Sequence, residues 1–133
     1  MDLLDLTPKS DEIVVFIKHP NTGEPLKNDN ESEMTITIYA PHSKEYKKVL
    51  HEQTNKRLKK MQSKEGDKDI TAEEIEEATL EALAKTTKEW NITYGGEMPK
   101  LTVAKAKEVY ETVFWIRSQI EGAIEDSLDF MKA

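Results

Sequence analysis

The first third of the chain has the hydrophobic pattern of β-strands. Residues 13–17 form an unbroken run of β-branched and aromatic side chains, a composition that favours a strand. In residues 34–39, Met34, Ile36 and Ile38 alternate with threonine and tyrosine, which is typical of a half-buried strand. Residues 19–26 lie between them and contain two prolines around a Thr-Gly pair, which indicates a turn. The pattern predicts a hairpin or a small antiparallel sheet in residues 11–41.

From Ser43 onward the hydrophobic period is that of helices. The first helix is predicted from an N-cap at Ser43 to about Gln62, with an apolar stripe of five side chains: Tyr46, Val49, Leu50, Leu58 and Met61. A polar connector at 63–70 precedes a capping box at residues 71–74, which begins a second helix that we expect to reach Lys88. Its predicted inward residues are Ile75, Ala78, Ala82, Leu83 and Thr86.

The last part of the chain is predicted to be a loop followed by further helix. Gly95, Gly96 and Pro99 place a loop at 90–101, and Thr102 is a candidate N-cap. The helical pattern after it is apolar all round at 114–116 and is weakened by Gly122, so we expect one kinked helix or two consecutive helices. Together these elements predict one α+β domain over residues 1–133. A small N-terminal antiparallel sheet or hairpin (11–41) precedes a C-terminal bundle of three to four helices (43–131).

Charge changes this picture mainly for the first two helices. The chain has 133 residues and a formal net charge of −7, which argues against a surface that binds nucleic acid everywhere. Residues 42–64 nevertheless contain eight Lys or Arg against two Glu. We interpret this basic stripe as a solvated face, or as one that pairs with the acidic second helix. A nucleic-acid-binding regulator that uses the helix at 43–62 is an alternative.

The residues of catalytic and metal sites are sparse. There is no cysteine, and His19, His42 and His51 do not have the spacing of zinc ligands. No sharp turn of the G-x-S-x-G kind presents a nucleophile, and the carboxylates at 73–81 lie on a predicted solvent-facing surface. We therefore expect no enzyme, no catalytic residue, no cofactor and no metal. The N-terminus is acidic where a signal peptide would be basic, so we expect no signal peptide. No apolar run is long enough to span a membrane, so we expect no membrane span either.

Aromatic residues in the second half of the chain are candidates for binding a protein partner. Trp and Tyr are enriched at binding hot spots, and the last predicted helix ends in carboxylates with almost no base to balance them. The partner-binding candidates are Trp115, Ile116, Ile120, Phe130, Trp90 and Tyr94. Packing of these side chains against the predicted sheet is the alternative use for them.

Four stretches resemble, in this order, the phage tail assembly chaperones, small proteins encoded just upstream of the tape measure in long-tailed phages. The first is the loop at 18–26 with its Thr-Gly-Glu-Pro sequence, and the second is the junction at 40–46. The third is the helix end at 83–90, which closes on Trp90, and the fourth is the tail at 101–130. Each motif is a packing or capping pattern without chemistry, so the resemblance depends on their succession.

The resemblance implies a non-enzymatic chaperone in the host cell cytoplasm. Such a protein binds the aggregation-prone tape measure protein, keeps it soluble, recruits subunits of the major tail-tube protein and leaves before the virion is complete. A homo-oligomer is compatible with this role. The alternative within the same context is a minor structural component that stays in the virion tail.

Overall fold

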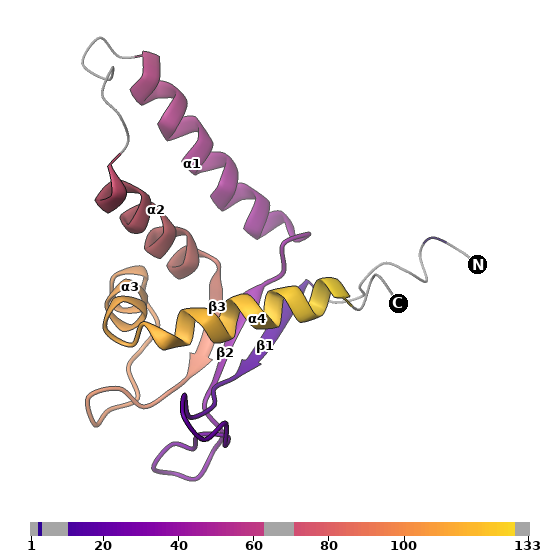
Figure 1. Ribbon diagram of the computed structural model, residues 1–133, viewed down its shortest axis with the longest axis vertical. Helices are drawn as coiled ribbons and strands as arrows, with labels where there is room; N and C mark the ends of the chain where they lie inside the picture. Colours follow the sequence, from indigo (N-terminus) through magenta and orange to yellow (C-terminus); the bar gives the residue numbers. More distant parts are fainter. Residues whose placement is uncertain (1–2, 4–10, 63–70, 130–133) are drawn as a thin grey trace.

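A three-stranded antiparallel sheet and four helices make up the part of the chain that the computed structural model describes, residue 3 and residues 11–62 and 71–129. The strands are β1 (Glu12–Phe16), β2 (Thr35–Tyr39) and β3 (Thr87–Asn91), in the order β1-β2-β3. The helices are α1 (Lys44–Gln62), α2 (Ala72–Lys85), α3 (Val103–Thr112) and α4 (Trp115–Asp129) (Figure 1). The predicted α+β fold class is therefore confirmed.

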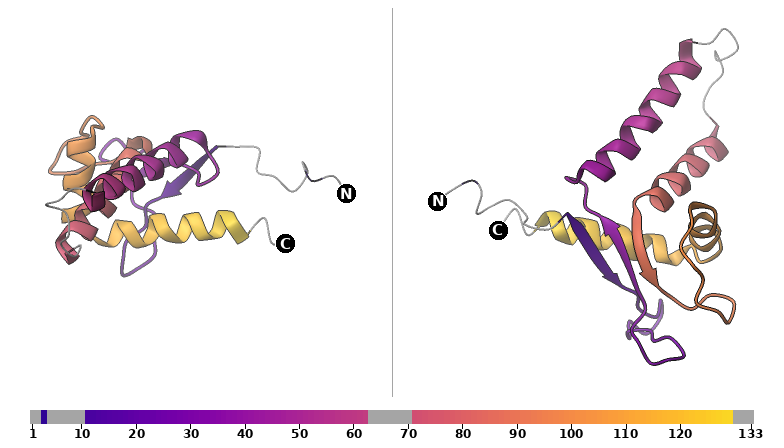
Figure 2. Two further views of the ribbon diagram at one scale, coloured as in Figure 1. Left: turned by 90° about the horizontal axis from the view of Figure 1, so that it is seen from above. Right: turned by 180° about the vertical axis from the view of Figure 1, so that it is seen from behind.

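The sheet is organised around its central strand, β2. Ile36 lies opposite Val15 on one side and Trp90 on the other, and both pairings are antiparallel. The alternation seen in the sequence puts Ile36 and Ile38 in the core, where they are fully buried. Helix α4 crosses this inner face of the sheet (Figures 1 and 2).

Strand β3 corrects the predicted boundaries at 86–91. The second helix was expected to reach Lys88 and a loop to begin at Trp90, but α2 ends at Lys85 and the chain continues directly into the sheet. Thr86 and Thr87 cause the change, because their hydroxyls donate to the carbonyls of Ala82 and Leu83 at 2.8 Å and so satisfy the helix end. β-branched residues then favour the extended conformation.

The core lies between the sheet and helices α2, α3 and α4. Its buried hydrophobic side chains are Val15, Ile17, Ile36, Ile38, Leu80, Ala84, Ile92, Ala106, Val109, Tyr110, Ile116 and Ile120. The connection between α3 and α4 is only two residues long, so the structure has two consecutive helices rather than one kinked helix.

Helix α1 and the start of α2 project away from the sheet (Figures 1 and 2). The predicted apolar stripe of α1 is only partly covered, since Val49 is buried while Leu50 and Leu58 are exposed; the side chain of Met61 and the connector at 63–70 lie outside the described residues. Ile75 was predicted to face inward but is 50% exposed, because the first turn of α2 extends beyond the sheet and α3. Leu80 and Ala84 provide the buried contact of α2 instead.

Candidate partner-binding site

An apolar pocket of about 190 Å³ lies where α3 meets α4. It is lined by residues from the strand ends, the segment after β3 and the two helices: Ile17, Leu26, Met34, Ile92, Thr93, Tyr94, Val109, Val113, Trp115 and Ile116. The deep walls are buried aliphatic side chains such as Ile17, Val109 and Ile116. Met34, Tyr94 and Trp115 are half-buried, so they form the part of the lining that meets solvent.

The loop after β3 fixes one wall of this pocket. The indole N–H of Trp90 donates to the carbonyl of Pro99 at 2.9 Å and ties the two ends of the loop together. Between them, Tyr94 and Glu97 are bridged across Gly95 and Gly96, whose φ angles of 64° and 79° are left-handed. Two successive positive φ angles are required by a tight turn of this type, which is why glycine occupies both positions. The turn holds Tyr94 at the pocket.

The short corner between the helices exposes the largest aromatic surface beside the pocket. Helix α3 ends at Thr112, and the N–H of Val113 still donates to the carbonyl of Val109 at 2.8 Å. The N–H of Arg117 donates to the carbonyl of Phe114 at 3.2 Å as α4 begins. Phe114 therefore sits at the turning point, where its side chain is 66% exposed.

The structure brings together three of the six candidate residues. Tyr94, Trp115 and Ile116 line the pocket. Ile120 is completely buried, which agrees with the alternative that these side chains pack in the interior. Trp90 belongs to β3 itself and is half-buried, with its ring edge-to-face against Tyr110 of α3. Phe130 lies outside the described residues. Phe114 is not among the six predicted candidates, although the sequence is apolar all round at 114–116.

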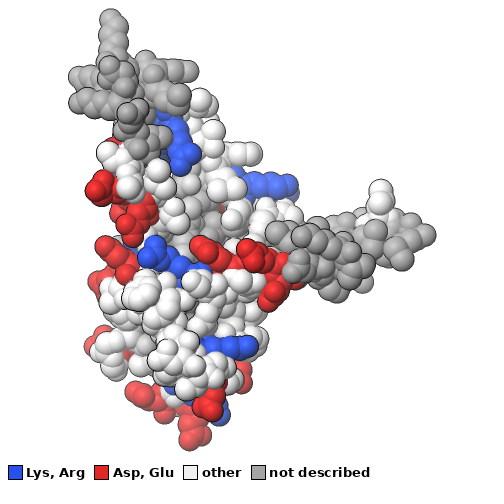
Figure 3. Space-filling view, in the orientation of Figure 1, with Lys and Arg blue, Asp and Glu red and all other residues white. Residues whose placement is uncertain are grey.

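Figure 3 shows mainly white side chains below the point where α3 meets α4, with blue and red side chains close to them. The charged residues nearest the pocket are on α3, where Lys105 pairs with Glu108 at 3.2 Å and lies over the ring of Tyr94. Val103 and Met98 add exposed hydrophobic surface on α3 and the loop. An exposed aromatic residue beside an apolar pocket is an arrangement that also occurs in protein-binding surfaces.

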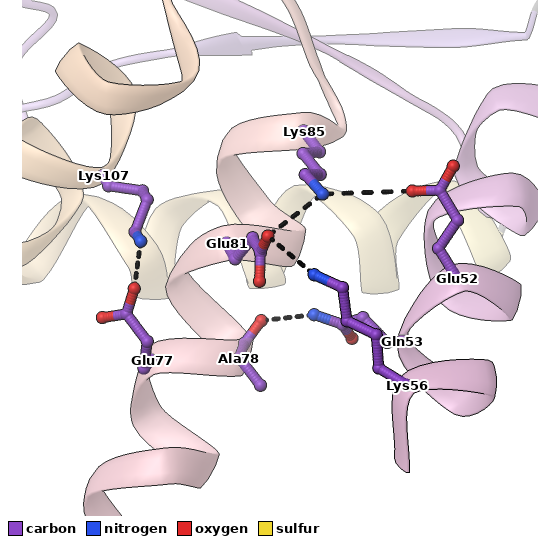
Figure 4. Close-up of polar contacts among 8 residues, drawn as sticks. All are labelled: Glu52, Gln53, Lys56, Glu77, Ala78, Glu81, Lys85 and Lys107. Atoms are coloured by element: carbon purple, nitrogen blue, oxygen red, sulfur yellow. Dashed lines mark hydrogen bonds and ion pairs between the residues drawn. The ribbon is translucent and has the colours of Figure 1, made fainter. Parts of the chain in front are cut away.

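A second candidate region is the polar seam between α1 and α2 (Figure 4). Glu81 accepts from Lys85 at 3.0 Å and from Lys56 at 3.4 Å, and these lysines, Lys85 first, hold the pKa of its carboxyl below the usual value. Gln53 donates its side-chain amide to the carbonyl of Ala78 at 2.6 Å. Lys56 of the basic face of α1 thus pairs with the acidic helix, which was one of the two interpretations of the basic stripe. A groove of about 460 Å³ beside the seam contains Ile75.

Two further lysines and one tyrosine have shifted pKa values. Hydrogen bonds to Glu12 and Glu77 raise the pKa of Lys88 and Lys107 respectively. Lys88 is exposed and Lys107 is half-buried, and each joins its element to another one through this ion pair. Burial raises the pKa of Tyr110 to about 12. Its hydroxyl is held inside the core and is out of reach of any substrate.

Two observations bear on ligand and membrane binding. Within residues 11–62 and 71–129, no three His, Asp or Glu side chains come together as a metal site would require. None of the helices in the same ranges is long and apolar enough to cross a membrane.

Comparisons with protein families, with curated proteins and with solved structures return no match.

Proposed function

We propose that this protein is a non-enzymatic phage tail assembly chaperone that binds the tape measure protein, keeps it soluble and recruits major tail-tube subunits. The observation that carries the proposal is the apolar surface at the corner of α3 and α4, where Phe114 is 66% exposed beside an apolar pocket. The sequence resemblance supplies the partners. Under this proposal the protein works in the host cell cytoplasm and is absent from the finished virion.

The size of the pocket supports a protein partner over a small substrate. Small-molecule sites usually have volumes of roughly 300 to 1,000 Å³. The pocket of about 190 Å³ is smaller, and its walls are almost entirely apolar side chains. It suits one apolar side chain of a bound segment, while Phe114 and Trp115 offer flat aromatic surface beside it.

The acidic remainder of the surface suits a chaperone role. A formal net charge of −7 keeps a complex with an aggregation-prone partner in solution by mutual repulsion. A small apolar patch supports reversible contacts, because only the surplus of buried apolar area over the cost of association appears as affinity.

Co-expression with the tape measure protein and the tail-tube protein from the same genome tests the proposal. We expect the tape measure protein to remain in the soluble fraction and to co-purify with this chain. Phe114→Ser is expected to abolish both effects, and Leu58→Ser is the matched control, because Leu58 is 49% exposed on α1, away from the patch. Precipitation of the tape measure protein with the wild-type chain, or equal behaviour of the two variants, contradicts the proposal.

Mass spectrometry of purified particles separates the chaperone from a minor virion component. A chaperone that leaves before completion is absent from finished particles but present in lysates of infected cells. A fixed copy number in the particles favours the structural alternative.

A further inference from the structure

The outer edge of β1 is an open hydrogen-bonding edge. The residues that flank β1 show which of its backbone groups face β2. The N–H of Ile17 donates to the carbonyl of Met34 at 3.0 Å, and the carbonyl of Asp11 accepts from the N–H of Ala40 at 2.8 Å, so the odd-numbered residues bond toward β2. Alternate residues of an antiparallel strand point their N–H and C=O groups in opposite directions. Val14 and Phe16 therefore direct their backbone groups away from the sheet. β1 has no other strand beside it in the described sheet.

Two neighbouring positions of this edge expose hydrophobic side chains, between the charged residues Glu12 and Lys18. Val14 and Phe16 are 48% and 52% exposed. Natural sheets usually protect such an edge with charges, prolines or a covering loop, because an open apolar edge pairs with other chains. This edge is not protected in that way at Val14 and Phe16, which makes it a template for an added strand.

One side-chain amide already shows how a peptide group fits the edge. At Lys18, the residue that follows the same alternation, the N–H donates to Gln119 Oε1 at 2.9 Å. Gln119 Nε2 donates in turn to the carbonyl of Lys18 at 2.7 Å. The amide of Gln119 thus occupies the position that one peptide unit of a fourth strand would take, and it marks where such a strand ends.

A groove continues from this amide along the edge. It has a volume of about 450 Å³ and runs between β1, the turn at 19–23 and the face of α4 that carries Gln119, Gly122, Ala123 and Asp126. At Gly122 a side chain would meet no other atom within 4 Å, so the α4 wall is open there. The groove therefore has room for the side chains of an extended segment beside the backbone edge.

The negative charges on α4 favour a positively charged segment in the groove. Its last turns carry Glu121, Glu125 and Asp126, which have no ion-pair partner in the described part of the chain, and Figure 3 shows carboxylates along this half of the helix. Asp126 lines the groove itself. A cation placed here would also be favoured by the C-terminal end of the helix dipole.

We infer that the edge of β1 and the groove against α4 bind an extended segment of a partner protein that carries Lys or Arg, which adds to the sheet as a fourth strand. Main-chain hydrogen bonds to Val14 and Phe16 supply the affinity, and the carboxylates of α4 supply the preference for a basic segment. A second copy of this chain is the poorer occupant, because pairing β1 with β1 brings two acidic α4 helices together. This inference does not depend on the tape measure protein.

Two synthetic peptides test the inference. Both alternate valine and threonine, and one has lysine at its ends where the other has glutamate. In amide NMR of the full chain, the lysine peptide is expected to shift the Val14 and Phe16 signals and to slow their hydrogen exchange. The glutamate peptide is expected to bind about tenfold more weakly, because its charges repel those of α4. Asp126→Lys should reduce or reverse this preference.

A large side chain at Gly122 blocks the groove without disturbing the fold. Gly122→Leu fills the open space and should weaken binding of the lysine peptide by about tenfold or more, whereas Gly122→Ala is the matched control. Both replacements raise helix propensity, so both variants should fold. Unchanged binding by the leucine variant overturns the inference.

Three other outcomes also overturn it. The first is that neither peptide perturbs Val14 or Phe16. The second is that their amides are already protected in a free protein whose mass in solution is that of a dimer, which assigns the edge to a second copy. The third is protection in a monomer that disappears when residues 1–10 are deleted, which assigns the edge to the chain's own N-terminal segment.

Discussion

The hydroxyls of Tyr110 on α3 and Thr87 on β3 lie 2.6 Å apart in the core. Thr87 donates its own proton to the carbonyl of Leu83 at 2.8 Å, so the phenol of Tyr110 is the donor in the contact between the two hydroxyls. This chain of two hydrogen bonds joins α3, the sheet and the end of α2. These hydrogen bonds lie at the end of α2, which was predicted at Lys88 and is found at Lys85.

Removing either hydroxyl is expected to have unequal effects on stability. Tyr110→Phe deletes one hydrogen bond and leaves Thr87 bonded to Leu83, so the free energy of unfolding should fall by about 1 kcal/mol. Thr87→Val leaves the buried phenol without an acceptor and should cost about 1 to 3 kcal/mol. Urea unfolding of both variants measures the difference. Equal losses would mean that the phenol finds another partner in the variant.

Tyr110 also makes stability depend on alkaline pH. Its pKa is raised to about 12 in the folded protein, while the unfolded chain has the ordinary value near 10. The folded state therefore keeps its proton where the unfolded state loses it. The stabilisation is complete below pH 10 and is lost as the pH rises from 10 to about 12, by roughly 2 to 3 kcal/mol.

Urea unfolding across this pH range checks the effect of Tyr110. The raised pKa values of Lys88 and Lys107 act in the same direction, so the test is the difference between the wild type and Tyr110→Phe. The variant should lose less stability than the wild type as the pH rises. Parallel pH profiles would contradict the assignment.

Buried Asn28 organises the loop before β2 and the end of β3. Its side-chain amide donates to the hydroxyl of Ser32 at 3.1 Å and to the carbonyl of Asn91 at 3.2 Å, and it accepts from Thr93 at 2.7 Å. Asn28→Asp keeps the shape but cannot make the donated bonds, so we expect a loss of about 2 to 3 kcal/mol in the free energy of unfolding. Thermal unfolding measures it.

Asn21 provides the control for this replacement. It is exposed in the turn at 19–23, so Asn21→Asp should change stability by less than about 0.5 kcal/mol. A loss at Asn21 as large as that at Asn28 would show that the added charge, rather than the lost donors, destabilises the protein.

Glu81 is expected to contribute to stability only above acidic pH. Lys85 and Lys56 lower its pKa in the folded state, so the unfolded state binds a proton first as the pH falls. The contribution is present above pH 4.5, the ordinary value, and is lost as the pH falls through the lower folded pKa. Because the pair is partly solvent-exposed, Glu81→Gln should cost no more than about 1 kcal/mol at neutral pH.

Acid titration of the wild type and of Glu81→Gln separates this contribution from that of other carboxylates. The free energies of unfolding of the wild type and of Glu81→Gln should converge at low pH. A constant difference down to the most acidic point would assign the effect to packing instead of charge.

Local signals in the sequence were sufficient for the caps and the turns. Ser43, Thr71 and Thr102 each accept from the backbone N–H three residues later, at 3.0 to 3.2 Å, as their positions predicted. Strand β3 was missed because charged Lys88 and Glu89 interrupt its hydrophobic pattern and its pairing with β2 is remote in sequence. The pocket was not predictable either, since it joins residues as distant along the chain as Ile17 and Trp115.

The buried face of α2 can be tested by comparing Ile75, which was predicted to face inward, with Leu80, which does. Helical periodicity alone placed Ile75 inward, but only tertiary contacts decide which turns of a helix are covered. Leu80 is 2% exposed between the sheet and α3, so Leu80→Ala should cost about 2 to 5 kcal/mol through lost burial and the cavity it leaves. Ile75→Ala should cost about 1 kcal/mol or less, because half of the side chain is already in water. Urea unfolding of the two variants measures the contrast. A loss at Ile75 equal to that at Leu80 would mean that the first turn of α2 is covered in solution.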